Sequence, residues 1–210
     1  MNPITEPFDQ YADQYEEWFK KNECAYKSEL KAVKNFIPNH KKGLEVGVGS
    51  GKFAIPLGIQ TGVEPSKEMR KLAKEKGLEV YEGIGEDLPF EADSFDFVLM
   101  VTTICFLSDI NKSFTEIRRI LKDNGRLIIG FVDKDSSLGQ VYQTHKTDNV
   151  FYKKATFYST EQVINLLKKH NFSGVKIVQT VFGKLSEINE VQQFQRGYGQ
   201  GGFVVIKADK

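Results

Sequence analysis

The chain is poor in cysteine, has no long apolar run and carries almost no excess charge. Its two cysteines, Cys24 and Cys105, are too few for a disulfide framework or a cysteine-rich zinc site, so we expect no metal and a reducing, cytoplasmic compartment. No apolar stretch approaches the ~20 residues that span a bilayer. The amino terminus is acidic and aromatic, whereas a signal peptide begins with positive charge. We therefore expect no membrane partner.

The balance of charge also argues against a polyanionic substrate. Lys and Arg number 29 and Asp and Glu number 28, a formal net charge of +1. Without a large positive field to gather a polyanion, nucleic acid is not expected as a partner. The 210 residues are 40% hydrophobic and 27% charged, which is typical of one ordinary globular domain. Nothing in the sequence indicates an oligomeric state.

Hydrophobic periodicity predicts helices in residues 8–37, followed by alternating strands and helices. The predicted strands are 44–48, 60–63, 78–81, 95–101, 126–132, 175–182 and 203–207, and the predicted helices between them are 52–57, 66–76, 110–121 and 160–170. Such alternation is typical of a parallel sheet with helices on both faces. Residues 133–158 break the pattern with polar and aromatic residues, as functional insertions do.

The most informative segment follows the first predicted strand and reads Leu44-Glu45-Val46-Gly47-Val48-Gly49-Ser50-Gly51. Glycines at such a turn let the backbone approach a ligand closely, and the following helix offers free N–H groups. The dinucleotide turn G-x-G-x-x-G would need glycine at position 52, where Lys52 stands. The acid at Glu45 suits a ligand with a positive group better than one with a pyrophosphate. The pattern thus favours adenosylmethionine over NAD.

A second acid, Glu64, ends the next predicted strand thirteen residues after Gly51. A carboxylate at this place can accept hydrogen bonds from both hydroxyls of a ribose. Alone, it could equally be a solvated acid that precedes a helix. Its position after the glycine turn favours the ribose.

In these features the chain resembles the class I S-adenosylmethionine-dependent methyltransferases, in particular the small methyltransferase type 11 domains, over about residues 40–132. The resemblance implies S-adenosyl-L-methionine as cofactor. It implies that the turn wraps the methionine portion and that the second-strand acid holds the ribose, with two further residues beside the adenine. These positions are Glu45, Gly47, Gly49 and Gly51 for the methionine, Glu64 for the ribose, and Pro65 and Met69 for the adenine.

A second motif strengthens the resemblance. The family has a segment like G-D-A-E-x-L-P-F before a strand reading S-F-D-x-V, and this chain has Gly83-Ile84-Gly85-Glu86-Asp87-Leu88-Pro89-Phe90 before Ser94-Phe95-Asp96-Phe97-Val98. Ile84 replaces the usual Asp that accepts from the adenine amino group. Adenine recognition would then fall to the backbone at Gly85 and Glu86, to the side chains of Glu86 or Asp87, or to apolar packing against Ile84.

The resemblance also implies a fold. We expect an α/β, Rossmann-like sheet of seven mostly parallel strands with helices on both faces, the last strand antiparallel, under a helical amino-terminal lid. Residues 1–210 would form one methyltransferase domain. Within it, 1–38 would be the lid, 40–132 the cofactor-binding core, 133–158 a substrate-side insertion and 159–210 the carboxyl-terminal helix and strands.

Methyl transfer from a sulfonium needs alignment more than a catalytic triad, because the cofactor supplies the activated group. If a general base is needed, His145 in the polar segment and Tyr15 in the lid are weak candidates; Tyr15 would also lie over the cofactor. Val101 and Thr102 should lie near its methionine end. The Asn/Asp-Pro-Pro-Tyr/Phe motif of amino-methylating nucleic-acid enzymes is absent after residue 101.

The leading hypothesis is therefore methyl transfer to a small-molecule acceptor through an unknown nucleophile. The acceptor pocket would lie between the lid and the segment 133–158, whose neighbourhood supplies the aromatic residues Phe131, Tyr142, Phe151, Tyr152, Phe157 and Tyr158. A non-catalytic regulator or subunit that binds adenosylmethionine is the alternative. An NAD-dependent oxidoreductase is disfavoured by Glu45 and Lys52.

Overall fold

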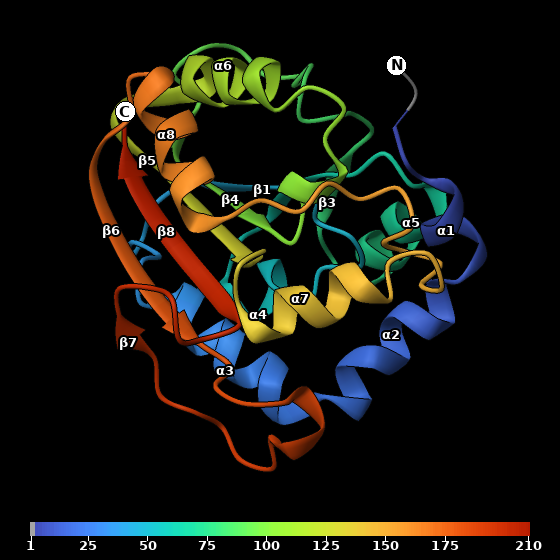
Figure 1. Ribbon diagram of the computed structural model, residues 1–210. Coiled ribbons are helices and arrows are strands. Elements are labelled where there is room, and N and C mark those ends of the chain that lie inside the picture. The colour runs from blue at the N-terminus through green and yellow to red at the C-terminus, as the bar shows by residue number, and fades with distance from the viewer. Residues whose placement is uncertain (1–2) are drawn as a thin grey trace.

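A computed structural model describes residues 3–210 and contains one sheet of eight strands, flanked by helices (Figure 1). The strands lie in the order β3-β2-β1-β4-β5-β8-β6-β7. Their bounds are β1 Gly43–Val46, β2 Thr61–Val63, β3 Glu79–Tyr81, β4 Phe95–Val101, β5 Leu121–Val132, β6 Ser173–Thr180, β7 Gln195–Arg196 and β8 Phe203–Asp209.

The pairing confirms the predicted α/β, mostly parallel sheet. Strands β3, β2, β1, β4 and β5 pair in parallel, and β8 runs antiparallel to both of its neighbours, β5 and β6. The sheet has eight strands rather than the expected seven. The additional strand, β7, consists of two residues that pair with Val178 and Gln179, which is too short for a periodic pattern to reveal.

Eight α-helices surround the sheet within the described part of the chain. They are α1 Glu6–Gln10, α2 Ala12–Lys21, α3 Glu23–Lys34, α4 Ala54–Leu57, α5 Lys67–Glu75, α6 Ile110–Ile120, α7 Ser137–Thr144 and α8 Thr160–Lys169. Side-chain caps fix where several of them begin. Ser66 accepts from the backbone N–H of Met69, and Ser159 forms a reciprocal capping box with Gln162 at the start of α8.

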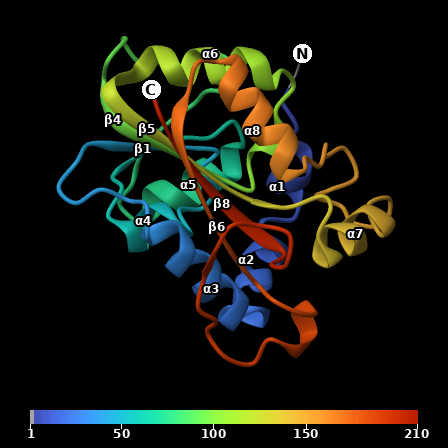
Figure 2. The same cartoon turned by 60° about the vertical axis from the view of Figure 1, so that its left-hand side comes forward.

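Strand β4 shows why both faces of the sheet must be covered. Its side chains alternate between two buried clusters, with Val98 and Met100 on one face and Leu99 and Val101 on the other. Helices α6 and α8 cover the first face, and α2 to α5 cover the second (Figures 1 and 2). A strand buried on both faces is a nearly continuous apolar run, and here only Asp96 interrupts it, which is why the sequence predicts this strand.

The segment 133–158 is more ordered than its sequence predicts. It contains α7, which begins where Ser136 accepts a hydrogen bond from the backbone N–H of Gly139 at 3.0 Å. Helix α7 lies beyond the carboxyl end of β5, on the same side as α1 and α2 (Figure 2).

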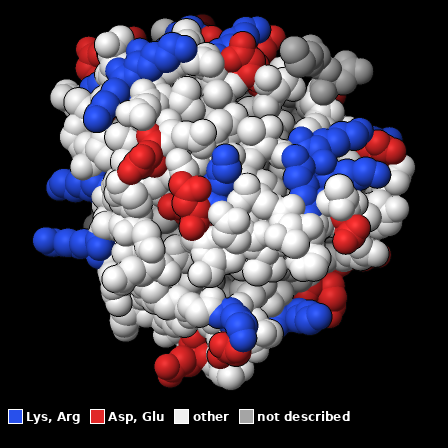
Figure 3. Space-filling view, viewed as in Figure 1, with Lys and Arg blue, Asp and Glu red and all other residues white. Residues whose placement is uncertain are grey.

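No helix within residues 3–210 has both the length and the apolar composition of a membrane span. Figure 3 shows acidic and basic side chains interspersed over one face, without a patch of one sign.

Candidate functional site

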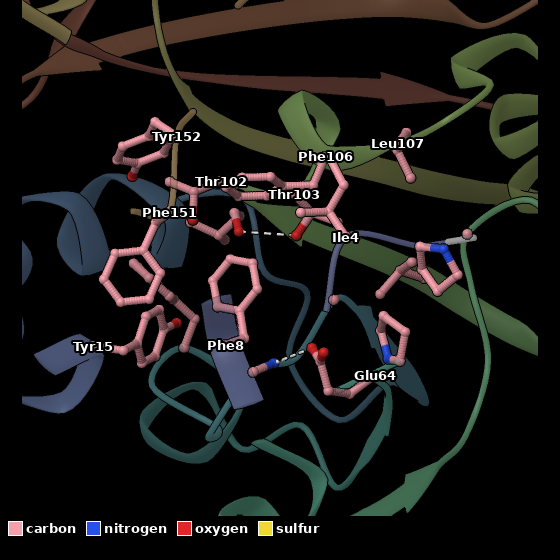
Figure 4. Close-up of a pocket in the computed structure, with 18 of the residues that line it drawn as sticks. Ile4, Phe8, Tyr15, Glu64, Thr102, Thr103, Phe106, Leu107, Phe151 and Tyr152 are labelled. Atoms are coloured by element: carbon pink, nitrogen blue, oxygen red, sulfur yellow. Dashed lines mark hydrogen bonds between the residues drawn. The ribbon is translucent and has the colours of Figure 1, made fainter. Parts of the chain in front are cut away.

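A cavity of about 360 Å³ opens at the carboxyl ends of β1, β2 and β4, where ligands bind in open α/β sheets. The residues that follow these strands form its floor, and α1, α2 and the segment 149–152 form its roof. Its lining includes Phe8, Tyr15, Trp18, Glu29, Gly47, Gly49, Glu64, Pro65, Ile84, Gly85, Glu86, Val101, Thr102, Thr103, Phe106, Tyr142, Phe151 and Tyr152. Figure 4 shows the rings of Phe8, Tyr15 and Phe151 on one side and Glu64 on the other.

Glu64 is held in place by the glycine turn. Its carboxylate accepts from the backbone N–H of Gly49 at 2.9 Å (Figure 4) and from the backbone N–H of Ser66 at 2.9 Å. The side chain is only 7% exposed. Burial raises the pKa of Glu64 to about 7, although these two N–H groups and Arg70 act in the opposite direction.

Two glycines of the turn shape the cavity wall. Gly47 and Gly49 have φ angles of +71° and +53°, which residues other than glycine rarely adopt. A Cβ at Gly47 would lie 2.5 Å from Oγ1 of Thr103, and one at Gly49 would lie 3.0 Å from the hydroxyl of Tyr15. The backbone therefore forms a bare surface at which a ligand can approach closely.

Three of the predicted cofactor residues lie beneath the cavity rather than on its surface. Gly51 packs against Ile55 and Leu78, and Met69 is 1% exposed in the core. Glu45 is also buried, one of its carboxyl oxygens has no hydrogen-bond partner among the described residues, and burial raises its pKa well above the ordinary value. These residues support the turn from below.

The turn after β3 brings Ile84, Gly85 and Glu86 to the cavity. Glu86 accepts from the backbone N–H groups of Ser108 and Asp109, at 2.6 and 3.0 Å. These hydrogen bonds connect the turn after β3 to the segment that precedes α6. The side chain of Asp87 is exposed and does not line the cavity.

The end of β4 carries backbone strain. Thr102 has a φ of +51°, an uncommon conformation for a β-branched residue. It is held there because its N–H donates to the carbonyl of Gly130 at 2.8 Å. The hydroxyl of Thr103 donates to the carbonyl of Val101 at 3.0 Å (Figure 4). Val101 and both threonines thus present fixed groups to the cavity.

The two weak candidates for a general base occupy different environments. His145 is exposed at the end of α7 and does not line the cavity. Tyr15 lines it, with its ring 6.1 Å from Phe8 and 6.2 Å from Phe151 between centroids. Burial raises the pKa of Tyr15 far above its ordinary value, so its hydroxyl stays protonated at neutral pH.

Polar contacts attach the amino-terminal helices to the core. Asp9 accepts from the hydroxyl of Ser66 at 2.7 Å. Glu16 accepts from the hydroxyl of Ser50, its second oxygen lies 2.6 Å from Nζ of Lys52, and Nζ of Lys76 lies 3.4 Å from the first. One carboxylate therefore joins α2 to the glycine turn and to the end of α5.

We expect Glu16→Ala to lower the stability of the protein by about 1–2 kcal/mol, because a partly buried carboxylate with three partners is lost. Thermal unfolding should show a Tm lower by roughly 2–6 °C. The control is Glu17→Ala, whose carboxylate pairs at the surface with Lys20, and this variant should change Tm little. Equal shifts in both variants would contradict this anchoring role.

Sequence reasoning missed several residues of the cavity. Phe8, Phe106 and Glu29 line it, while Phe131, Phe157 and Tyr158 of the predicted aromatic set do not. One signal for Glu29 existed: it shares a helical face with Ala25, Ala32 and Val33, at the spacing i, i+4, i+7 of a buried stripe. An acid on an apolar face indicates either a buried partner or a ligand.

A Rossmann-like sheet with a glycine turn, a second-strand acid and an aromatic roof defines a class I methyltransferase. The family described as methyltransferase domain matches residues 44–129. A structure from Thermotoga maritima, described as a SAM-dependent methyltransferase and possible histamine N-methyltransferase, is 46% identical with a TM-score of 0.96, covering 99% of this chain and all of that one.

The chain also has relatives in sequence. An uncharacterized protein of Methanocaldococcus jannaschii is 45% identical over 97% of this chain and 98% of its own length. An uncharacterized methyltransferase of Alkaliphilus oremlandii is 31% identical over 61% of this chain and 67% of its own length.

The chain belongs to the S-adenosylmethionine-dependent methyltransferases. It is an enzyme whose methyl donor is S-adenosylmethionine, which sets aside the two alternatives, a non-catalytic binding protein and an NAD-dependent oxidoreductase.

Proposed function

We propose that the enzyme methylates a small molecule held inside the cavity. The observation that carries the proposal is the roof: α1, α2 and the segment 149–152 cover the cavity with the rings of Phe8, Tyr15 and Phe151. An enclosed, largely aromatic site suits a compact acceptor, whereas a polymer needs an open groove.

The cofactor would lie along the floor. Gly47 and Gly49 would cradle its methionine portion, Glu64 would accept from the ribose hydroxyls, and Pro65 with Ile84, Gly85 and Glu86 would border the adenine. Val101 and Thr102 would stand beside the sulfonium. The fit rests on two observations: a Cβ at either glycine would fill the cradle, and the charged side chains of the described lining are all carboxylates, which suits a cationic donor.

The chemistry supplied by the bound cofactor is an activated methyl group on sulfur. The protein's own residues then align and shield. The fixed backbone at Thr102 and Thr103 sets the floor, while Phe8, Tyr15 and Phe151 exclude water from above. Because Tyr15 stays protonated, it serves as a wall and a hydrogen-bond donor rather than as a base.

The deciding experiment has two stages. Calorimetric titration with adenosylmethionine and adenosylhomocysteine should give micromolar affinities, and NAD should not bind. A panel of amines, phenols and carboxylates, with histamine among the amines because of the Thermotoga maritima relative, is then assayed for formation of adenosylhomocysteine. Turnover of a small molecule supports the proposal; turnover confined to peptides or nucleic acids overturns it.

We expect affinity for the cofactor to fall as pH drops through 7. The pKa of Glu64 is raised to about 7 by burial, and only the ionised carboxylate can accept from both ribose hydroxyls. Protonation therefore competes with binding, and Kd should rise about tenfold between pH 8 and pH 6. Calorimetry on Glu64→Gln across the same pH range is the control, since it retains any titration of the ligand itself. An identical pH slope in both proteins would contradict the assigned role of Glu64.

A further inference from the structure

We propose that the acceptor is an amine that binds as its cation, and that Glu29 is the residue that recognises it. An ammonium nitrogen has no lone pair, so an amino group that is itself methylated first gives its proton to the Glu29 carboxylate, and its nitrogen then takes the methyl group as the bond to sulfur breaks. This inference rests on the proposed function and deepens it, because it assigns the chemical class of the acceptor. Glu29 acts here as a specificity-determining residue.

Glu29 is a buried carboxylate that has no partner among residues 3–210. It lies on α3, is 5% exposed and lines the cavity. Its side chain makes no hydrogen bond and no ion pair with any described residue, and desolvation is the sole cause that raises its pKa, to about 8. Leaving such a group unpaired is costly in a folded protein, so a ligand is the natural partner.

The other charged groups of the cavity do not compete for this role. Among the described residues that line it, three are carboxylates and none is Lys, Arg or His. Glu64 is engaged by the N–H groups of Gly49 and Ser66, and Glu86 by those of Ser108 and Asp109. Of these three carboxylates, only that of Glu29 has no hydrogen-bond donor or cation beside it among the described residues. An anionic acceptor would find no cationic side chain among these residues.

Aromatic side chains line the same cavity as Glu29. Tyr142 stacks on Tyr152 with their ring centroids 5.2 Å apart, and Trp18 lies beside Tyr142. Glu29, Tyr142 and Tyr152 all line the cavity, and the charge of Glu29 adds to burial in raising the pKa of both tyrosines. Aromatic faces attract cations and stack on planar groups. A ring that carries a short aminoalkyl chain matches this combination.

The inference is tested with three ligands of one shape and different charge: 2-phenylethylamine, 2-phenylethanol and 3-phenylpropanoate. Each is titrated into the protein saturated with adenosylhomocysteine, so the cofactor site is filled. We expect the cation to bind at least about tenfold more tightly than the alcohol, and the anion not to bind. Equal affinity for the cation and the alcohol, or preferred binding of the anion, overturns the inference.

Variants assign the preference to one residue. Glu29→Gln should weaken the cation about tenfold and leave the alcohol within about threefold, while Glu29→Asp, which keeps the charge, should retain part of the preference. Glu23→Gln removes an exposed carboxylate from the same helix and should change nothing. If Glu29→Gln leaves the preference intact, Glu29 is not the recognition residue.

Binding of adenosylhomocysteine distinguishes a failure of the inference about Glu29 from a failure of the proposed function. Retained affinity for it in Glu29→Gln shows that the variant is folded and that the cofactor site is intact. If the wild-type protein binds it and methylates an acceptor other than an amine, the inference fails and the proposed function stands. If the wild-type protein does not bind it, the proposed function fails as well.

Discussion

Gly49→Val is expected to abolish measurable binding of adenosylmethionine, a loss of about 100-fold or more. Two effects combine. At a φ of +53° any side chain is strained, and a β-branched one most of all. Its Cβ would also lie 3.0 Å from the hydroxyl of Tyr15, so the side chain fills the space between the glycine turn and the roof. The N–H of Gly49, which positions Glu64, would shift at the same time.

Gly58 provides a matched control for the strain. It also has a positive φ, +73°, but a Cβ there would meet no atom within 4 Å, and it lies outside the cavity at the end of α4. Gly58→Val should therefore lower Tm through backbone strain while leaving Kd within about threefold. Calorimetry measures Kd, and thermal unfolding measures the strain. A comparable loss of affinity in both variants would show that strain, rather than an occupied site, explains the result at Gly49.

The fold could be predicted from sequence wherever a local pattern determines it. Strand β4 is apolar because both of its faces are buried, and α5 begins where a serine caps it. The two-residue strand β7 has no period, so its pairing depends on tertiary contacts alone. The sequence predicts helices over residues 8–37, but it does not predict the break at Tyr11, which has φ −121° and ψ +34° and divides α1 from α2. No glycine or proline marks that break.

The site could be predicted only in part, for a related reason. Residues that follow the strands reach the cavity because parallel strands end at one edge, which places Gly47, Gly49, Glu64 and Val101 there. Other positions of the predicted site lie away from the cavity, and Gly51 and Met69 are covered by protein. The roof depends on how α1, α2 and the segment 149–152 fold over the sheet. No local pattern indicates that arrangement.

Glu29 shows what the sequence could not decide. Its place on the apolar face of α3 indicates burial, but whether a carboxylate there meets a protein cation or a cavity depends on residues far away in the chain, such as Tyr142 and Tyr152. Active sites commonly carry a group that destabilises the ligand-free protein. An unpaired, buried carboxylate should have a measurable effect on stability that does not require knowledge of the substrate.

We expect the stability of Glu29→Gln relative to the wild type to rise as pH increases from 5 to 9. The pKa of Glu29 is raised by burial from its ordinary value of 4.5 to about 8 in the folded protein. Between these values the unfolded chain binds fewer protons than the folded one, so wild-type stability falls as pH rises through this window and levels off above pH 8. The full effect is on the order of several kcal/mol, or roughly 5–15 °C in Tm. The variant lacks this pH-dependent loss of stability.

The measurement is the difference in Tm between variant and wild type in the ligand-free protein, taken at each pH. A buried amide adds its own cost, but that cost does not change with pH, so the slope of the difference isolates the carboxylate. Glu45 and Glu64, whose pKa values are also raised, are present in both proteins and cancel. Glu23→Gln, at an exposed position of the same helix, should give a flat difference. A flat difference for Glu29→Gln too would mean that its carboxylate is already compensated, and it would remove the reason to expect a cation in the cavity.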